Sequence, residues 1–353
     1  IKADMTLDAD LYNRFIYDQN IQALYATFGG KAGNLSFQGG LRGEIWQVRT
    51  RSLGYGQTEA DVEPFKKNRA QLFPSAFISY SFPRQNEMQV NYTRRIRRPW
   101  GGQLNSFQNT SDPTNISYGN PQLAPEYSNS FELNYIKTWE KHMATVSGYY
   151  RTTDNVIQRI NFINENTGVM NSTFDNVSQS VSTGAEFVIK NNFFDVVDLT
   201  TTANVFYYKL DGFSFRPANS SQIVTGDGDS NFTWNIRAMA NVSLPWGLGL
   251  QVNGGYNAPM VVAQGRQSAN YVMDAGLNKS FGKWTINFNV RDLLDSRKRE
   301  STTYGNGYTQ FSRGWGSGRR FQISLSYSFG NMKPKMEEGR GPRHDDGGPG
   351  MDD

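Results

Sequence analysis

Residues with catalytic or metal-binding potential are few and lie far apart in the sequence. The chain has two histidines, His142 and His344, and no cysteine. A histidine-based zinc site, a catalytic triad and a disulfide framework are therefore poorly supported. Asp227 and Asp229 are closely spaced in "TGDGDSN", but this stretch lacks the further carboxylates of a calcium-binding loop. We therefore expect no catalytic residue, no metal site and no cofactor.

Two carboxylates stand where polar and apolar residues strictly alternate. In "SFELNY", Phe131 and Leu133 share one face of an expected strand, and Glu132 lies on the other face. In "GAEFVI", Glu186 likewise lies opposite its apolar neighbours. The alternation predicts that both carboxylates point toward a polar interior. Both could be ordinary solvated residues of that interior.

Four arginines and a tryptophan mark the end of another expected strand, in "YTRRIRRPW" (Arg94, Arg95, Arg97, Arg98 and Trp100). By alternation, Arg94 shares the apolar face, whereas Arg95 and Arg97 share the polar face. Guanidinium groups bind phosphates and carboxylates. Arg94 is therefore a candidate for phosphate contacts, and Arg95 and Arg97 are candidates for an anionic ligand. A solvated rim is an equally good interpretation.

Strands rather than helices must position these residues, because polar and apolar side chains alternate along most of the chain. In "NFTWNIRAMANVSL", Trp234 and Ile236 belong to a set of alternate residues that share one face. The same pattern recurs in "WTINFNVR" and "FQISLSYSF", and helical periodicity is absent. We expect about thirteen strands, near residues 20–28, 34–50, 71–82, 86–98, 127–139, 141–160, 170–191, 196–211, 230–243, 247–257, 269–280, 283–293 and 319–330.

The connections between these strands alternate in length. Short turns such as "PRQN", "LPWG" and "FGK" are separated by long polar loops. The loops are expected near residues 51–70, 99–126, 161–169, 212–229, 258–268 and 294–318. Short turns at one end and long loops at the other are typical of a membrane β-barrel. A soluble sheet would bury its apolar face under a second layer, and neither helices nor a second pattern supply one.

Aromatic residues lie at or beside the short turns, where rings at one level would form a girdle at a membrane interface. They are Phe82, Trp139, Phe193, Trp246, Phe281 and Phe329. The alternative is that aromatic residues simply favour strands.

The net charge argues against a nucleic-acid-binding protein. The chain has 36 Lys and Arg residues against 32 Asp and Glu residues, and this excess of positive charge is too small for such a function.

Four motifs carry a family resemblance. "YGNPQLAPEYSNSFELNYIK", at residues 118–137, resembles a stretch typical of TonB-dependent outer-membrane receptors. "STGAEFVIK", "FNVRDLLDSRKRE" and "RRFQISLSYSFG" are similar to later motifs of that family, in the same order. The first two expected strands, with "IYDQNIQALYATFGG" and "LSFQGGLRGEIW", resemble barrels of this family from Bacteroidota-like, Gram-negative bacteria.

The resemblance implies a barrel of about 22 strands that surrounds a plug. Residues 1–330 would then be the C-terminal part of this barrel, and residues 331–353 a disordered, charged Gly/Pro-rich tail on the periplasmic side. The plug domain and the first strands are expected to lie outside this chain. The TonB–ExbB–ExbD complex would act on the receptor through that plug.

The resemblance also implies roles for single residues. Glu132 and Glu186 match two inward-facing glutamates that pair with plug arginines, which suits a mobile plug because such contacts can be broken. Arg94 could contact lipopolysaccharide phosphates beside the membrane lipid. The loops around Trp100 and Trp315 mix aromatic, amide and glycine residues that suit sugars or peptides. A surface lipoprotein is a further expected partner.

We therefore interpret the chain as part of an all-β, antiparallel transmembrane barrel in the outer membrane. The function that the resemblance implies is TonB-dependent import of a scarce solute, such as a siderophore, an oligosaccharide or a peptide. A plug-less porin or adhesin is the main alternative. A membrane-barrel enzyme is a weaker one, because His142 lies beside a short turn, at the wrong end for a rim site. A soluble all-β binding protein is weaker still.

Overall fold

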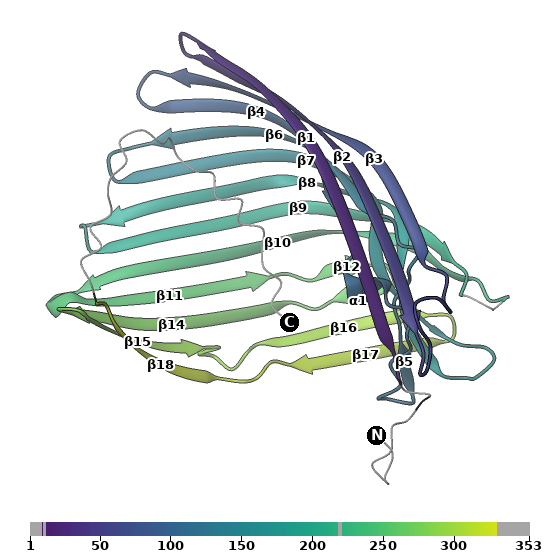
Figure 1. Ribbon diagram of the computed structural model, residues 1–353. Helices are drawn as coiled ribbons and strands as arrows, with labels where there is room; N and C mark the ends of the chain where they lie inside the picture. Colours follow the sequence, from purple (N-terminus) through teal and green to yellow (C-terminus); the bar gives the residue numbers. More distant parts are fainter. Residues whose placement is uncertain (1–8, 10–11, 218–220, 330–353) are drawn as a thin grey trace.

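The computed structural model describes residue 9 and residues 12–217 and 221–329. The predicted tail, residues 331–353, lies outside these residues. A curved, open sheet contains thirteen consecutive antiparallel strands, with β1 and β18 at its two edges (Figure 1). In order these strands are β1 (Arg14–Ala32), β2 (Leu35–Leu53), β3 (Phe65–Phe82), β4 (Asn86–Arg97), β6 (Glu126–Thr138), β7 (His142–Ile163), β8 (Met170–Phe193), β9 (Val197–Phe215), β10 (Val224–Leu244), β11 (Leu248–Asn257), β14 (Asn270–Phe281), β15 (Trp284–Arg291) and β18 (Arg320–Tyr327).

Each of the thirteen predicted strands corresponds to one strand of this sheet, and the prediction of an antiparallel barrel wall is confirmed. Several strands extend further into the long loops than the alternation predicted. β3 begins at Phe65 rather than near residue 71, and the long loop predicted at 212–229 shrinks because β9 ends at Phe215 and β10 begins at Val224. The alternation missed these outer ends because charged residues and glycines interrupt it, as in "FKKNRA" of β3 and "VTGDGD" of β10.

The two faces of the sheet differ in polarity, as the alternation predicted. Ile78, Val90 and Leu133 are cross-strand neighbours on one face and are 51%, 54% and 48% exposed. We call this apolar face the outer face, because exposed large apolar side chains on a transmembrane barrel contact lipid. Ser75 and Thr93 are cross-strand neighbours on the opposite, inner face, together with Ser130.

The predicted girdle residues are all exposed and lie at the short-turn end of the strands. They are Phe82, Trp139, Phe193, Trp246, Phe281 and Phe329. The turns there are tight enough to force positive φ on non-glycine residues, including Phe194 at 57° and Trp246 at 62°. Trp246 lies in the one-turn 3-10 helix η2 (Pro245–Gly247). Contact of these rings with a membrane interface stays a prediction.

The long loops contain structure that the alternation did not predict. The α-helix α1 (Gly101–Leu104) and strand β5 (Asn115–Ser117) belong to the loop between β4 and β6. The loops between β11 and β14 and between β15 and β18 together build a second sheet. Its strands, in order, are β12 (Met260–Val262), β13 (Gly265–Gln267), β16 (Lys298–Gly305) and β17 (Tyr308–Trp315). Among the described residues, no helix is long and apolar enough to cross a membrane.

Among the described residues, two small apolar cores lie at this long-loop end. One packs the outer end of the β7–β8 hairpin, including Ile160 and Val177, against Leu210 and Phe213 of β9. The other packs Trp46 and Val48 of β2 against Leu104, Leu123 and Ile157. The loop between β4 and β6 therefore bridges β2 and β7 through buried apolar contacts, and it forms part of a folded extracellular layer.

Candidate functional site

The loop from Arg98 to Pro125 is the centre of the candidate site, because it connects distant strands through buried polar contacts. Pro99 and Pro125, near its two ends, are fully buried. β5 of this loop pairs in parallel with β8, from Asn115 opposite Met170 to Ser117 opposite Ser172. The loop is thus joined to the extracellular end of the wall by backbone hydrogen bonds as well as by side chains.

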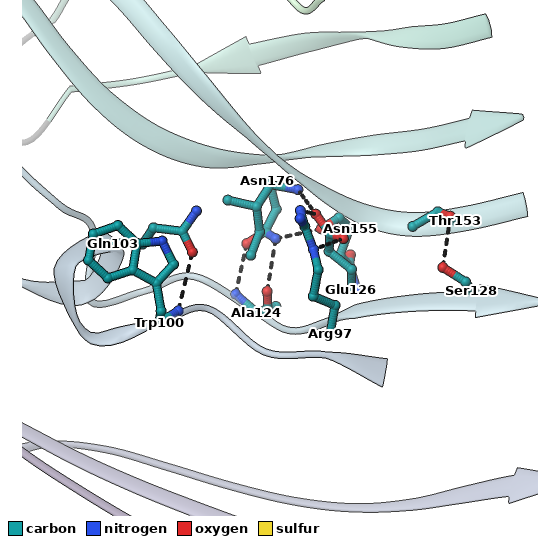
Figure 2. Close-up of polar contacts among 10 residues, drawn as sticks. Arg97, Trp100, Gln103, Ala124, Glu126, Ser128, Thr153, Asn155 and Asn176 are labelled. Carbon is teal, nitrogen blue, oxygen red and sulfur yellow. Dashed lines mark hydrogen bonds and ion pairs between the residues drawn. The ribbon is translucent and has the colours of Figure 1, made fainter. Parts of the chain in front are cut away.

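Glu126 holds the end of this loop at the point where β6 begins (Figure 2). Its carboxylate accepts two hydrogen bonds from Arg97, at 2.6 Å from Nε and 2.5 Å from Nη2. It also accepts the backbone N–H of Ile157 at 2.7 Å. Because β6 starts at Glu126 while β7 continues, this carboxylate replaces the strand carbonyl that Ile157 would otherwise face. A buried amide is thereby satisfied by a side chain.

Asn176 of β8 binds the backbone of Ala124, two residues before Glu126. Its Oδ1 accepts the Ala124 N–H at 2.7 Å, and its Nδ2 donates to the Ala124 carbonyl at 3.0 Å and to the Asn155 carbonyl at 2.7 Å (Figure 2). The side-chain amide of Asn176 thus makes the two hydrogen bonds with Ala124 that the backbone of a paired strand would make. Asn120, in the same loop, donates to the Phe174 carbonyl at 3.0 Å.

Glu44 forms a second buried ionic contact at the start of the loop. Its side chain is 4% exposed and pairs with Arg98 and with Arg42, whose Nε lies 2.6 Å from Glu44 Oε1. Breaking a buried pair on one side is strongly destabilising, because the remaining charge is left in a poorly solvated place. The pair therefore fixes the beginning of the loop to β2.

Glu132 and Glu186, the two predicted inward carboxylates, lie on the inner face but do not contact each other. The register places Glu132 opposite Tyr149 and Glu186 opposite Ser147 on the intervening strand β7. Glu132 Oε1 lies 3.8 Å from Arg151 Nη2 and accepts the Ser130 hydroxyl at 2.9 Å. The Glu186 carboxylate has no hydrogen-bond or ion-pair partner among the described residues.

The predicted arginine cluster is largely engaged within the chain. Arg97 and Arg98 are paired with carboxylates, and the Arg94 guanidinium lies 5.8 Å from the centre of the Tyr127 ring. Arg95 is exposed. Its binding of an anionic ligand, like lipopolysaccharide binding by Arg94, stays a prediction.

The two predicted ligand-contact tryptophans are both exposed, but they lie in different parts of the extracellular layer. Trp100 precedes α1 and is 64% exposed. Trp315, at the end of β17, is 68% exposed and has the Arg313 guanidinium 5.7 Å from its ring centre. Ligand contact by either residue stays a prediction.

The structure adds Glu44, Glu126 and Asn176, which sequence reasoning did not select. Glu126 stands in the quoted "APEYSNSF", directly after the loop and six residues before Glu132. The expected loop at residues 99–126 included Glu126, whereas the structure makes it the first residue of β6, opposite Arg97 at the end of β4. Alternation alone identifies the face of a side chain and does not identify its partner.

Asp292, within the "VRDLLD" motif, organises the loop after β15. Its side chain is almost fully buried, its φ is 56°, and its Oδ1 accepts the backbone N–H of Ser296 at 2.9 Å and of Arg297 at 3.2 Å. Arg297 in turn pairs with Asp274 at 3.3 Å. The motif therefore closes a turn that starts the β16–β17 hairpin.

No cluster of His, Cys, Asp and Glu residues that could hold a metal ion lies among the described residues. Asp227 and Asp229 lie in β10 rather than in a loop, and Asp229 pairs with Arg266 at 3.5 Å.

Two groups in the loop between β4 and β6 have shifted pKa values. Burial raises the pKa of the Tyr118 phenol. Hydrogen bonds from the Thr114 side chain and backbone lower the pKa of the Asp112 carboxyl.

Solved structures with the same fold are outer-membrane receptors. The ferric yersiniabactin uptake receptor FyuA from Yersinia pestis has a TM-score of 0.58 at 14% identity, over 90% of this chain and 47% of that one. The siderophore receptor PiuA from Acinetobacter baumannii has a TM-score of 0.57 at 12% identity, over 88% and 44%. The siderophore receptor PirA from Pseudomonas aeruginosa has a TM-score of 0.53 at 12% identity, over 89% and 57%.

The chain thus spans about half the length of these receptors. No curated protein sequence matches it. The family model described as the outer membrane protein beta-barrel family matches residues 2–327, and these residues carry the wall and the extracellular layer described above. Together with the receptor fold, this match confirms the resemblance to TonB-dependent receptor barrels and the outer-membrane location. The chain belongs to the outer membrane protein beta-barrel family.

Proposed function

We propose that this chain is the C-terminal barrel part of a TonB-dependent importer that takes up a scarce solute across the outer membrane. The observation that supports this most directly is the extracellular layer, which is folded and joined to the inner wall by Glu44, Glu126 and Asn176. A fixed layer above a polar wall suits capture of a solute followed by passage along that wall. The solved structures with this fold are named as an uptake receptor and as siderophore receptors.

In this proposal, Glu132 and Glu186 hold the plug through its arginines. Glu186 is the more available carboxylate, since it has no partner among the described residues. Glu132 is already close to Arg151, but that contact is long at 3.8 Å and its groups are 35% and 50% exposed. Partly exposed ion pairs contribute little to stability, so Glu132 can exchange Arg151 for a plug arginine.

Uptake measurements test the proposed function. A strain that lacks the full-length gene is grown with iron complexes, oligosaccharides or peptides as the limiting nutrient. We expect a growth defect on one nutrient class, rescue by the wild-type gene, and loss of that rescue when TonB is also deleted. Rescue that persists without TonB would contradict active import and would favour a plug-less porin.

Carboxylate substitutions in the full-length receptor test the plug contacts. We expect Glu186→Gln to loosen the plug and reduce uptake more than Glu132→Gln does, because Glu132 already has an internal partner. Plug retention is measured by protease access to the plug from the periplasmic side. Glu140→Gln, at an exposed short turn, is the charge-matched control. Normal plug retention and uptake in the double variant would remove this role.

The outer surface has proposed partners of its own. We assign lipopolysaccharide phosphates to Arg94 and the membrane interface to the exposed aromatic rings at the short turns, such as Trp139 and Trp246. A surface lipoprotein would dock on the extracellular layer, where β17 is a free strand edge among the described residues. Cross-linking in intact cells, followed by identification of the captured lipid or protein, tests these assignments.

A further inference from the structure

A cavity of about 610 Å³ lies in the extracellular layer, between the loop that follows β4 and the outer ends of β7 and β8. Its volume falls in the range that holds a small-molecule ligand. Its wall combines aromatic rings, side-chain amides, hydroxyl groups and one guanidinium. The wall includes Trp100, Asn105, Phe107, Asn109, Tyr118 and Arg159.

The wall of this cavity is held in place by backbone contacts. The N–H of Gly119 donates to the Asn105 carbonyl at 2.7 Å, and the N–H of Tyr118 donates to the Ser172 carbonyl of β8 at 3.0 Å. A Cβ at Gly119 would lie only 2.5 Å from the Gln103 carbonyl oxygen, so a glycine is needed for this close approach. The cavity is therefore largely preformed, which lowers the entropy cost of binding.

Trp100 provides a flat, accessible surface at the cavity. Its ring packs over Gly102, where an added Cβ would lie 1.8 Å from a ring carbon. Its backbone N–H donates to the Gln103 side chain at 3.2 Å (Figure 2). The side chain is nevertheless 64% exposed. A supported ring with an open surface suits stacking against the apolar C–H face of a sugar.

Arg159 is the charged residue of the cavity wall, and it has no carboxylate partner among the described residues. Its Nη1 donates to Ser172 Oγ at 3.1 Å, and its guanidinium lies 5.1 Å from the centre of the Phe174 ring. These contacts orient the group without neutralising it. Arg97 and Arg98, by contrast, are both neutralised by glutamates. The cavity thus combines one positive charge with a wall of neutral hydrogen-bonding groups.

We infer that this cavity is the capture site for a short acidic oligosaccharide. Arg159 binds a carboxylate of the sugar in the two-pronged geometry that guanidinium groups favour. Trp100 stacks on a sugar ring, and amides such as Asn105 and Asn109 bind hydroxyl groups, for which they offer both donors and acceptors. A multiply charged anionic metal complex fits less well, because the cavity wall offers a single cation. This inference rests on the proposed import function.

Binding by the full-length protein in detergent tests the inference. The labelled protein is applied to an array of uronate-bearing and neutral oligosaccharides, and the best uronate ligand is then titrated by calorimetry. We expect binding to uronate sugars alone, with affinity reduced about tenfold to a hundredfold by Arg159→Gln, because charged hydrogen bonds are lost. We expect Trp100→Ala to weaken the same ligand at least about tenfold.

Two matched variants serve as controls. Arg299→Gln removes an exposed extracellular charge and Tyr55→Ala removes an exposed ring of the loop between β2 and β3, both outside the cavity. Both should bind like the wild type, and circular dichroism checks that all four variants are folded. Binding of neutral sugars at equal strength, absence of uronate binding, or normal binding by folded Arg159→Gln would each overturn the inference.

The binding result and the uptake result are separable. If the receptor imports another nutrient in a TonB-dependent way and Arg159→Gln leaves that uptake unchanged, the capture site is wrong and the import function stands. If uronate sugars bind through Arg159 but their uptake is independent of TonB, the site stands and the import mechanism is wrong.

Discussion

Removal of the Glu126 carboxylate is the most informative perturbation of the extracellular layer. In Glu126→Ala, the backbone N–H of Ile157 loses its acceptor at a position that is 7% exposed. An unsatisfied buried amide costs about 1–3 kcal/mol. The lost pair with Arg97 adds about 0.2–1 kcal/mol, because the arginine side chain is 57% exposed and its charge is screened.

The two contributions amount to about 1–4 kcal/mol, which raises the population of the open loop about fivefold to nearly a thousandfold. Hydrogen exchange of the full-length protein, followed by mass spectrometry of peptides that cover Ile157 and the loop at residues 98–125, measures this change. Glu126→Gln keeps an oxygen acceptor for Ile157 and should fall between the wild type and Glu126→Ala. Glu140→Ala, at an exposed turn, should have no effect on this loop.

Unchanged exchange in Glu126→Ala would refute the reasoning, because it would mean that the carboxylate does not replace the missing strand partner of Ile157. If hydrogen exchange is as fast in Glu126→Gln as in Glu126→Ala, the effect comes from the lost charge of Glu126 instead. The first outcome concerns the hydrogen bond and the second concerns the ion pair, so the two contributions are measured separately.

Three further predictions concern the extracellular loops. Asp292→Ala should open the turn after β15, since two backbone amides lose an acceptor at about 1–3 kcal/mol each, and faster hydrogen exchange there would show it. Gly119→Ala should destabilise the loop by about 1–3 kcal/mol, because the new Cβ meets the Gln103 carbonyl; protease cleavage of the loop measures this. Thr114→Val should raise the pKa of Asp112 toward its ordinary value, as NMR titration would show. Because the folded-state pKa is lowered, this contact stabilises the loop above the ordinary pKa, and that contribution is lost as pH falls through the folded-state pKa. An unshifted Asp112 titration, resistance of Gly119→Ala to protease, or normal exchange in Asp292→Ala would contradict the corresponding contact.

The wall of the barrel is predictable from the sequence because each strand separates lipid from water along most of its length. Leu133 and Glu132 illustrate this, since the alternation assigned both side chains to the faces on which the structure places them. The same rule places Trp234 and Ile236 on the exposed face of β10. Because every strand must separate lipid from water, this part of the fold can be predicted from the sequence.

The structure of the extracellular layer could not be predicted from the alternation in the same way. Residues 65–70, "FKKNRA", form the outer end of β3, and apolar and polar residues do not alternate along them. β12 and β13 have three residues each, too few for a period to be recognised. Glu126 and Asn176 act through partners that are 31 and 52 residues away in the sequence. Such pairings depend on the assembled fold, so alternation could not find them.

Site-directed spin labelling tests the central claim, the orientation of the wall, most directly. The chain has no cysteine, so single cysteines introduced at Leu325 and Ser326, neighbours on β18 that are both exposed, can be labelled selectively. In the full-length protein in lipid bilayers, the label at 325 should be relaxed by oxygen, which dissolves in lipid, and the label at 326 by a water-soluble nickel chelate. The reverse pattern, or equal access of the nickel chelate to both positions, would contradict a lipid-facing apolar surface and the account built on it.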